Sequence, residues 1–323
     1  MKKILLPLLC LMLASCSNKK QPTTQSAAVD YAAVQIPEFN ADSAYRFVAD
    51  QLAFGFRTPG SKGHEQCAQY LVRQMGRWCD TVIVQEFGAT LWDGSEYKGR
   101  NIIASLNPER ENRVLLAAHW DSRLWADHDP DTTNRRKPIM GANDGASGVG
   151  ALMEMARVMS QQRPDMGVDF VFFDMEDQGI PEWADIYRDN TWCLGSQYWT
   201  QYPHRPFYNA AFGVLFDMVG TPNPRFTKEE VSRTYAPGIT NKLWQAAAAL
   251  GKGHVFVDRN TDAILDDHMY VNQIRKIPMV DIVQNTDGIS FFPYWHTLGD
   301  NLDCIDRESL KVVADVTMKV IYE

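Results

Sequence analysis

The sequence predicts an α/β domain in three layers, with a central, mostly parallel mixed sheet between two layers of helices. Short apolar runs of strand length alternate along the chain with longer segments that carry apolar residues at helical spacing. The run at 168–173 is apolar except for Asp169, which is typical of a strand covered on both faces. The composition is 45% hydrophobic and 22% charged, and 323 residues are enough for one large α/β domain.

Two helices open the predicted domain. The segment 40–54 places Phe47 and Leu52 on one face, and the segment 67–78 does the same with Leu71. The elements that follow are, in chain order, strands at 81–87, 101–106 and 113–118, a polar loop at 122–140, a helix at 145–158, strands at 168–173 and 211–216, a helix at 241–250, strands at 254–257 and 278–283, and a helix at 307–322.

The first fifteen residues predict a signal segment that is not part of this fold. Lys2 and Lys3 precede an apolar run at 4–13, which is too short to span a bilayer. Residues 13–16, Leu-Ala-Ser-Cys, resemble a bacterial lipobox, which implies that Cys16 becomes the lipidated first residue of the mature protein. An ordinary secretory signal with an incidental cysteine is the alternative.

This N-terminus predicts the division of the chain. Residues 1–15 are the expected signal peptide, 16–38 a polar flexible tether, and 39–323 a single catalytic domain. The expected location is the cell envelope, facing the periplasm, and the choice between inner and outer membrane stays open. The anchor on Cys16 is the expected contact with the membrane.

Charge and cysteine content narrow the class of protein further. The net charge of −8 argues against nucleic acid and against an anionic membrane surface as partners. Four cysteines follow the anchor, at Cys67, Cys79, Cys193 and Cys304, and none has the C-x-x-C spacing of a cysteine zinc site. An oxidising compartment permits disulfides, with Cys67 and Cys79 as candidates for a local pair, and the pairing stays open.

Acidic residues and histidines cluster in six places, most of them just beyond the predicted strands. Open α/β sheets place their sites at the carboxyl ends of their strands, so these clusters are candidate site residues. The clusters are His119-Trp120-Asp121, the glycine-flanked turn Gly141-Ala142-Asn143-Asp144-Gly145, Asp174-Met175-Glu176-Asp177, Asp217-Met218-Val219-Gly220, Asp266-Asp267-His268 and Trp295-His296-Thr297.

The residue types in these clusters suit a zinc site. Carboxylates mixed with imidazole bind Zn²⁺, and a catalytic site needs three protein ligands and an open position, which Asp144, Asp177 and His296 could supply. Glu176 would then be held beside the metal as a proton carrier. Each residue alone has a simpler reading, since an Asp at a helix start is commonly an N-cap. The recurrence of such clusters at the strand ends of one sheet favours a site.

The ordered motifs His-x-Asp, Gly-x-Asn-Asp-x-x-Ser-Gly, Asp-x-Glu-Asp, Asp-x-x-Gly and Asp-His resemble the zinc aminopeptidase family and its glutaminyl cyclase branch. The resemblance runs from about residue 50 to the C-terminus. It implies a zinc-exopeptidase-like α/β/α sandwich with Asp144, Asp177 and His296 as zinc ligands and Glu176 as the general acid/base. Asp177 stands where the family more often has Glu, and a shorter carboxylate still ligates zinc.

The two branches of this family differ in chemistry. In the aminopeptidases a bridging Asp is shared by two zincs, and the second is held by residues that match His119 and Asp217 here. The cyclases resemble one another in keeping these residues while working with one zinc, and the residue matching Asp217 joins an acidic network. The presence of both side chains therefore does not exclude a dinuclear peptidase.

Three features favour the cyclase. Trp295 precedes His296 in a Trp-His-Thr motif, Asp266 opens the Asp-Asp-His motif of the acidic network, and Trp183 follows Asp177 by six residues. Core packing is the alternative for both tryptophans. The expected substrate contacts are Trp183, Trp295 and His119, and the expected catalytic residues are Glu176, Asp217 and Asp266.

The predicted activity is that of a glutaminyl-peptide cyclotransferase. It would convert the N-terminal glutamine of peptides and proteins to pyroglutamate with release of ammonia, using one Zn²⁺ per chain as a Lewis acid and Glu176 as proton carrier. A zinc aminopeptidase with two zincs is the alternative within the family. A non-catalytic lipoprotein that binds peptides is a third hypothesis, which the intact set of acidic residues and histidines disfavours. The oligomeric state is not predicted.

Overall fold

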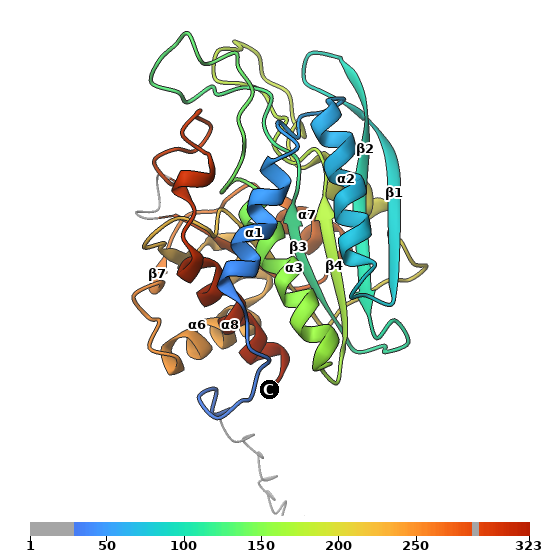
Figure 1. Cartoon of the computed structure of the whole chain (residues 1–323), viewed down its shortest axis with the longest axis vertical. Helices are drawn as coiled ribbons and strands as arrows, with labels where there is room; N and C mark the ends of the chain where they lie inside the picture. Colours follow the sequence, from blue (N-terminus) through green and yellow to red (C-terminus); the bar gives the residue numbers. More distant parts are fainter. Residues whose placement is uncertain (1–28, 286–290) are drawn as a thin grey trace, which may run out of the picture.

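The computed structural model describes residues 29–285 and 291–323 (Figure 1). A six-stranded sheet with the order β1-β2-β4-β3-β5-β8 forms its centre. The strands are β1 (Thr81–Thr90), β2 (Glu96–Leu106), β4 (Gly167–Phe173), β3 (Arg113–His119), β5 (Phe212–Asp217) and β8 (Met279–Val283). The last four run parallel, whereas β1 and β2 form an antiparallel edge that joins β4 through β2. The predicted mostly parallel mixed sheet is confirmed.

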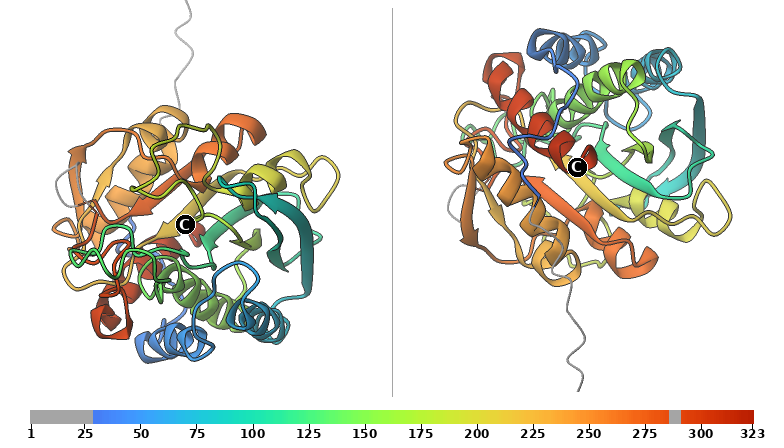
Figure 2. Two further views of the ribbon diagram at one scale, coloured as in Figure 1. Left: turned by 90° about the horizontal axis from the view of Figure 1, so that it is seen from above. Right: turned by 90° about the horizontal axis from the view of Figure 1, so that it is seen from below.

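Helices cover both faces of this sheet. The blue α1 and α2, the green α3 and the red α8 lie together on one side (Figures 1 and 2), and α4 with the segment α7–η1 packs on the other. The helical elements are α1 (Ala41–Leu52), α2 (Lys62–Met75), α3 (Ala146–Gln161), α4 (Leu194–Gln201), α5 (Glu230–Tyr235), α6 (Pro237–Ala249), α7 (Asp267–Tyr270), η1 (Val271–Arg275), η2 (Leu302–Cys304) and α8 (Arg307–Ile321).

Strand β3 shows why the layers form on both sides. Its seven residues are all buried. Leu116 and Ala118 contribute to the hydrophobic core under α1, α3 and α8, whereas Leu115 and Ala117 contribute to the core under α4 and η1. Because successive side chains of a strand point to opposite faces, a continuously apolar strand requires cover on both.

Side-chain caps explain where the helices begin. Asn40 accepts a hydrogen bond from the backbone N–H of Ser43 at the start of α1, and Asp306 does the same for Ser309 at the start of α8. Helix α2 begins earlier than predicted, because Ser61 caps it through the N–H of His64 and its first turn is polar. Hydrophobic periodicity does not mark a polar first turn.

The apolar run predicted as a strand at 254–257 does not join the central sheet. Strand β7 (Phe256–Asn260) pairs with β6 (Phe226–Lys228) in a separate two-stranded sheet. The ring of Phe256 packs against Phe226 and against Trp244 of α6. The apolar residues of this run are therefore buried against a helix and a short strand. The periodicity and composition of the sequence do not distinguish this arrangement from pairing in the central sheet.

The predicted signal peptide and Cys16 lie outside the described residues, and the end of the predicted tether is packed. The hydroxyl of Tyr31 donates a hydrogen bond to Glu323, and Lys319 of α8 donates to the carbonyl of Val34. Within residues 29–285 and 291–323, no helix is both long and apolar enough to cross a membrane. The segment just before α1 is thus held against the C-terminal helix.

The four cysteines of the described residues are free thiols, so the local pair of Cys67 with Cys79 is not formed. Cys67 lies inside α2, which continues to Met75 before the chain reaches Cys79. Eight helical residues span about 12 Å, well beyond the reach of a disulfide. Helix α2 therefore separates two cysteines that lie close together in the sequence.

Candidate active site

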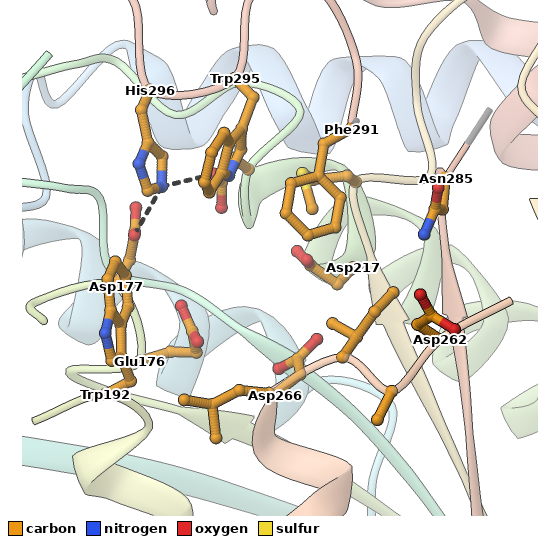
Figure 3. Close-up of a pocket in the computed structure, with 15 residues that line it drawn as sticks. Glu176, Asp177, Trp192, Asp217, Asp262, Asp266, Asn285, Phe291, Trp295 and His296 are labelled. Atoms are coloured by element: carbon orange, nitrogen blue, oxygen red, sulfur yellow. Dashed lines mark ion pairs between the residues drawn. The ribbon is translucent and has the colours of Figure 1, made fainter. Parts of the chain in front are cut away.

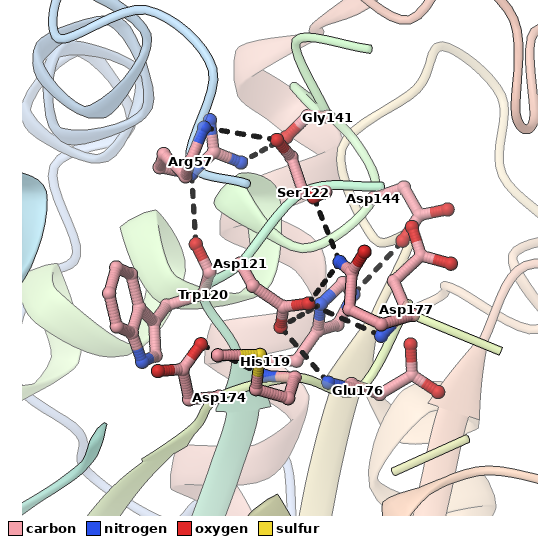
Figure 4. A network of polar contacts seen from close by, with 12 residues as sticks. Arg57, His119, Trp120, Asp121, Ser122, Gly141, Asp144, Asp174, Glu176 and Asp177 are labelled. Atoms are coloured by element: carbon pink, nitrogen blue, oxygen red, sulfur yellow. Dashed lines mark hydrogen bonds and ion pairs between the residues drawn. The ribbon is translucent and has the colours of Figure 1, made fainter. Parts of the chain in front are cut away.

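The carboxyl ends of three neighbouring parallel strands bring the predicted clusters together. His119 ends β3, and Asp174 to Asp177 follow β4 directly (Figure 4). Asp217 ends β5. Asp144 lies in the turn that leads into α3, and Asp266 caps α7. These are the positions at which an open α/β sheet gathers functional side chains.

Buried side chains fix the loops that carry these residues. The carboxylate of Asp121 accepts hydrogen bonds from the backbone N–H groups of Glu176 (3.1 Å) and Asp177 (3.3 Å). Asp300 accepts in the same way from Asn143 (2.7 Å) and Asp144 (3.2 Å). The backbone that carries Glu176, Asp177 and Asp144 is therefore held by two further carboxylates.

Arg57 supports the same loops from the side of α1. Its guanidinium is fully buried and donates to the carbonyls of Trp120 (2.9 Å), Met140 (2.7 Å) and Gly141 (2.7 Å), as Figure 4 shows in part. Sequence reasoning did not find Arg57 or Asp300, because both bind backbone atoms and belong to no motif of ligand type.

Asp144, Asp177 and His296 form one group whose ligand atoms all lie within 4.8 Å of one another. The Nε2 atom of His296 lies 3.0 Å from Oδ1 of Asp177 and 3.7 Å from Oδ2 of Asp144. All three residues are buried. The structure thus brings the three predicted zinc ligands to one point, although they come from three separate loops.

This group fits a metal ion by its own chemistry. The Oδ2 atom of Asp177 is buried and has no hydrogen-bond partner among the described residues. A buried carboxylate oxygen without a partner is costly unless a cation or a proton satisfies it. Two carboxylates and one imidazole with room for a further ligand are the donor set of a catalytic zinc site.

Asp127 and Arg123 back this group. Oδ1 of Asp127 lies 3.4 Å from Nδ1 of His296, and the same carboxylate accepts two hydrogen bonds from Arg123, at 2.8 and 2.6 Å. Arg123 also donates to the carbonyl of Asp177 (2.9 Å). A carboxylate behind a ligating histidine fixes the orientation of its ring, so these two residues align two of the three ligands at once.

A second group shares Asp144 with the first. Nε2 of His119 lies 2.9 Å from Oδ1 of Asp144 and 3.2 Å from Oδ1 of Asp217, and the three ligand atoms again lie within 4.8 Å. Nδ1 of His119 lies 3.4 Å from Asp121. The geometry therefore offers two adjacent groups with one aspartate in common.

Glycine is required where α3 begins beside His119. A Cβ atom at Gly145 would lie 2.6 Å from the imidazole of His119 and 2.3 Å from its backbone oxygen. Cβ atoms essentially never approach other atoms this closely, so the glycine permits the turn carrying Asp144 to approach the end of β3. The glycine-flanked turn of the sequence has this physical reason.

A pocket opens directly above the acidic residues, with a volume of about 320 Å³ (Figure 3). Aromatic and aliphatic side chains form its walls, while carboxylates line its floor. The lining includes Asp144, Glu176, Asp177, Trp192, Asp217, Met218, Ile264, Leu265, Asp266, Phe291, Trp295 and His296. A small apolar cavity with a few convergent polar groups is the usual form of a ligand site.

The three predicted catalytic carboxylates all face this pocket (Figure 3). Burial raises the pKa of Glu176 well above its ordinary value, and the charges of Asp266 and Asp177 raise it further against the opposing effect of His119. Burial likewise raises the pKa of Asp217 and of Asp266. Crowded carboxylates in a dry site share protons, so this cluster can accept and return one.

The structure corrects the choice of one tryptophan. Trp183 packs edge-on against Trp125 at 6.1 Å and under Arg136 at 4.8 Å, and it does not line the pocket. Trp192 lines it instead, and its ring lies parallel to that of His296 at 6.0 Å. The loop after β4 folds back on itself. The number of residues that separates a tryptophan from Asp177 therefore does not predict which one lines the pocket.

Two further predicted substrate contacts have different outcomes. Trp295 lines the pocket, with its ring stacked on His296 at 3.8 Å and tilted against Phe291 at 4.7 Å. His119 lies behind the carboxylates and does not line the pocket, being 1% exposed and in contact with Asp144 and Asp217. Because His119 ends β3, its side chain lies beneath the floor of the pocket, where it contacts the carboxylates from behind.

Fold and site together define an enzyme of the metal-dependent α/β class, with carboxylate and imidazole ligands at the ends of parallel strands. The chain belongs to peptidase family M28, whose model matches residues 101–321. The predicted family is thereby confirmed, and zinc is the metal that this membership supports.

Solved structures and curated proteins resemble the whole domain. A Zn-dependent exopeptidase from Parabacteroides distasonis is 47% identical, with a TM-score of 0.88 over 90% of this chain and 100% of that one. A glutaminyl cyclase from Bacteroides thetaiotaomicron, bound to N-acetylhistamine, is 46% identical, with a TM-score of 0.88 over 90% and 99%. Glutaminyl-peptide cyclotransferase from Bos taurus is 26% identical over 300 residues, 83% of this chain and 78% of its own.

Proposed function

We infer that the chain is a zinc-dependent glutaminyl cyclase, a transferase that converts N-terminal glutamine to pyroglutamate and releases ammonia. The observation that carries this inference is the placement of Glu176, Asp217 and Asp266 around a small aromatic pocket beside the metal group. The likeness to the Bacteroides cyclase and to the bovine cyclotransferase extends over most of the chain and supports it.

The pocket suits a single side chain at the end of a peptide. Trp192, Trp295 and Phe291 form walls that exclude water around a short aliphatic chain. Cyclisation requires that the α-amine of glutamine attack its own γ-carbonyl carbon, so the chain must be held in a folded conformation. An enclosing apolar wall favours that compact conformation over an extended one.

Glu176 carries the proton in this reaction. Its carboxylate accepts a proton from the attacking α-amine as the bond to the side-chain carbonyl carbon (Cδ) forms, and returns it to the departing amide nitrogen, which leaves as ammonia. Zinc held by Asp144, Asp177 and His296 would supply Lewis-acid polarisation of the γ-carbonyl. The α-amine is itself the nucleophile in this reaction, whereas peptide hydrolysis requires a water molecule as nucleophile.

Asp217 and Asp266 lie on the floor of the pocket beside Glu176. They help the floor both to accept the proton and to return it. Burial raises the pKa of all three carboxyl groups, which favours the sharing of a proton among them. A protonated neighbour donates a hydrogen bond, while an ionised one accepts from the α-amine. The carboxyl groups on the pocket floor can therefore hydrogen-bond to the α-amine nitrogen of the substrate both before and after it loses its proton.

We propose that one zinc per chain is bound, by the group containing Asp177. That group contains Oδ2 of Asp177, a buried carboxylate oxygen that has no hydrogen-bond partner among the described residues. Metal analysis of protein purified with zinc present tests this, with about one zinc expected for a single catalytic site. Two zincs per chain would favour the aminopeptidase hypothesis.

The deciding experiment uses a peptide that begins with glutamine and follows ammonia and peptide mass together. Cyclisation releases ammonia and leaves every peptide bond intact, whereas an aminopeptidase releases free glutamine. The same peptide with an acetylated α-amine is the control, because it has no nucleophile for ring closure. Release of free glutamine without ammonia would contradict the proposed function.

The substrates we propose are peptides and proteins with N-terminal glutamine, met at the cell envelope by an enzyme anchored through Cys16. The positive start, the short apolar run and the lipobox-like residues of the sequence support this location. Labelling with a fatty-acid analogue in a bacterial host tests it, with Cys16→Ser as the matched variant. Equal labelling of both proteins would contradict the anchor.

A further inference from the structure

Cys193 closes the long loop after β4 and immediately precedes α4. Its side chain is fully buried, and its backbone φ is +58°, in the left-handed region that residues other than glycine and asparagine seldom occupy. Strained backbone of this kind persists where surrounding contacts hold it, and it is common beside functional groups. The carbonyl of Cys193 accepts hydrogen bonds from Ser196 and Gln197 of α4, and its N–H and thiol contact Glu176.

Three hydrogen bonds join the two ends of this loop. The backbone N–H of Cys193 donates to the carbonyl of Glu176 (2.8 Å), and that of Leu194 donates to the carbonyl of Met175 (3.0 Å). The sulfur of Cys193 then donates to Oε1 of Glu176, at 3.2 Å. The proton-carrying residue is therefore held by one cysteine at both its backbone and its carboxylate.

The thiol keeps its hydrogen in this environment. Burial raises the pKa of Cys193 well above its ordinary value, and the charges of Glu176 and Asp267 raise it further. A protonated thiol is a weak donor, whereas a thiolate has no hydrogen to donate. The contact between sulfur and Oε1 is thus an S–H···O hydrogen bond at neutral pH.

Orientation is what Glu176 needs from such a partner. Its side chain is partly exposed and lines the pocket, so its carboxylate could rotate between several rotamers. Proton transfer requires one oxygen within hydrogen-bond reach of the reacting nitrogen. A donor on Oε1 holds that oxygen toward the protein, which leaves Oε2 to face the pocket.

A second buried cysteine of this chain shows the contrast. Cys67 belongs to the main hydrophobic core, where a cysteine fills space as a small apolar residue. The sulfur of Cys193 instead lies within 4.8 Å of carboxylate oxygens of both Glu176 and Asp266. A side chain placed among carboxylates is poorly explained by apolar packing.

We propose that Cys193 is a positioning residue, whose thiol orients the carboxylate of Glu176 for proton transfer in the cyclisation. This inference rests on the proposed function and adds a residue to it.

The test compares Cys193→Ser, Cys193→Val and Cys67→Ala with the unaltered chain. Serine keeps a donor, valine keeps the bulk without one, and Cys67→Ala removes a buried thiol that does not line the pocket. Ammonia release from a Gln-initiated peptide gives kcat and KM, and zinc content and thermal unfolding are measured on the same samples. We expect Cys193→Val to lower kcat about 10-fold with little change in KM.

The expected result also has Cys193→Ser within about threefold of the unaltered kcat and Cys67→Ala unchanged in kcat. A folded, zinc-loaded Cys193→Val with normal kcat would overturn the proposal, as would a raised KM with normal kcat. Serine as impaired as valine would overturn it too. If valine does not fold, Cys193→Ala takes its place. An unaltered chain that releases no ammonia would contradict the proposed function itself.

Discussion

Nδ1 of His296 lies 3.4 Å from Oδ1 of Asp127, and both oxygens of the same carboxylate accept hydrogen bonds from the guanidinium of Arg123. The three side chains are buried, so the pair of Arg123 with Asp127 forms a rigid support behind the metal group. Ligand geometry in this protein is therefore set by residues that no ligand motif contains.

Weakening this support should weaken zinc binding. Asp127→Asn removes the negative charge behind His296 and should reduce zinc affinity about 10- to 100-fold. Competition with a chromogenic chelator measures the affinity, and Asp131→Asn, on the exposed part of the same loop, is the control. An unchanged affinity in the folded Asp127→Asn variant would show that the carboxylate does not act on the ligand.

Replacing Glu176 with glutamine should abolish turnover while zinc stays bound. Glutamine keeps the shape of the side chain but cannot carry the proton, so kcat should fall by about 10²–10⁴. Ammonia release gives the rate and metal analysis gives the zinc content. Asp185→Asn, an exposed change in the same loop, should leave both unaltered. Retained activity in Glu176→Gln would refute the assigned role.

The two tryptophans of the loop after β4 should behave differently. Trp192 lines the pocket and Trp183 does not, so Trp192→Leu should lower kcat/KM for a Gln-initiated peptide about 10-fold. Trp183→Leu should stay within about twofold of the unaltered chain. Steady-state kinetics on both variants decide the matter. The opposite ranking would mean that the pocket wall closes differently around substrate.

Burial of His204 should make stability depend on pH. Burial lowers its pKa to about 4, and its Nδ1 accepts a hydrogen bond from Nε1 of Trp199 (3.2 Å), which requires the neutral ring. Because the folded pKa lies below the unfolded value of about 6.5, stability is complete above pH 6.5 and declines as the pH falls toward 4.

Substituting this histidine should flatten the curve. Between pH 7 and 4 the unaltered chain should lose on the order of 2 kcal/mol more unfolding free energy than His204→Gln. Urea unfolding at several pH values measures the difference, and other titrating groups are common to both proteins. Parallel curves would show that His204 is not the group responsible.

The layered fold was predictable because its signals are local. Strand β3 is apolar without interruption from Val114 to Ala118, and α1 and α8 carry apolar faces at helical spacing. Strand β7 was misplaced for the same reason. The short apolar run at 255–257 indicates burial, but the partners that bury it, which for Phe256 are Phe226 and Trp244, are contacts distant in the sequence.

The candidate site was predictable in its chemistry and less so in its surroundings. Asp144, Asp177 and His296 lie in recognisable motifs, and the structure brings them within 4.8 Å of one another. Arg57, Asp300 and Arg123 hold those motifs through backbone carbonyls, N–H groups or a carboxylate. Such roles leave no pattern in one sequence, because a buried Arg or Asp is identified by what surrounds it.

The sequence by itself determined the class of fold, the family and the kinds of side chain that could hold a metal, since strand ends and motif spacing are properties of neighbouring residues. The tertiary structure alone decided that Trp192 forms the pocket wall, that His119 lies behind the floor and that Cys193 reaches Glu176. A loop of about twenty residues returns to its starting point through backbone hydrogen bonds, and such closure depends on the whole fold.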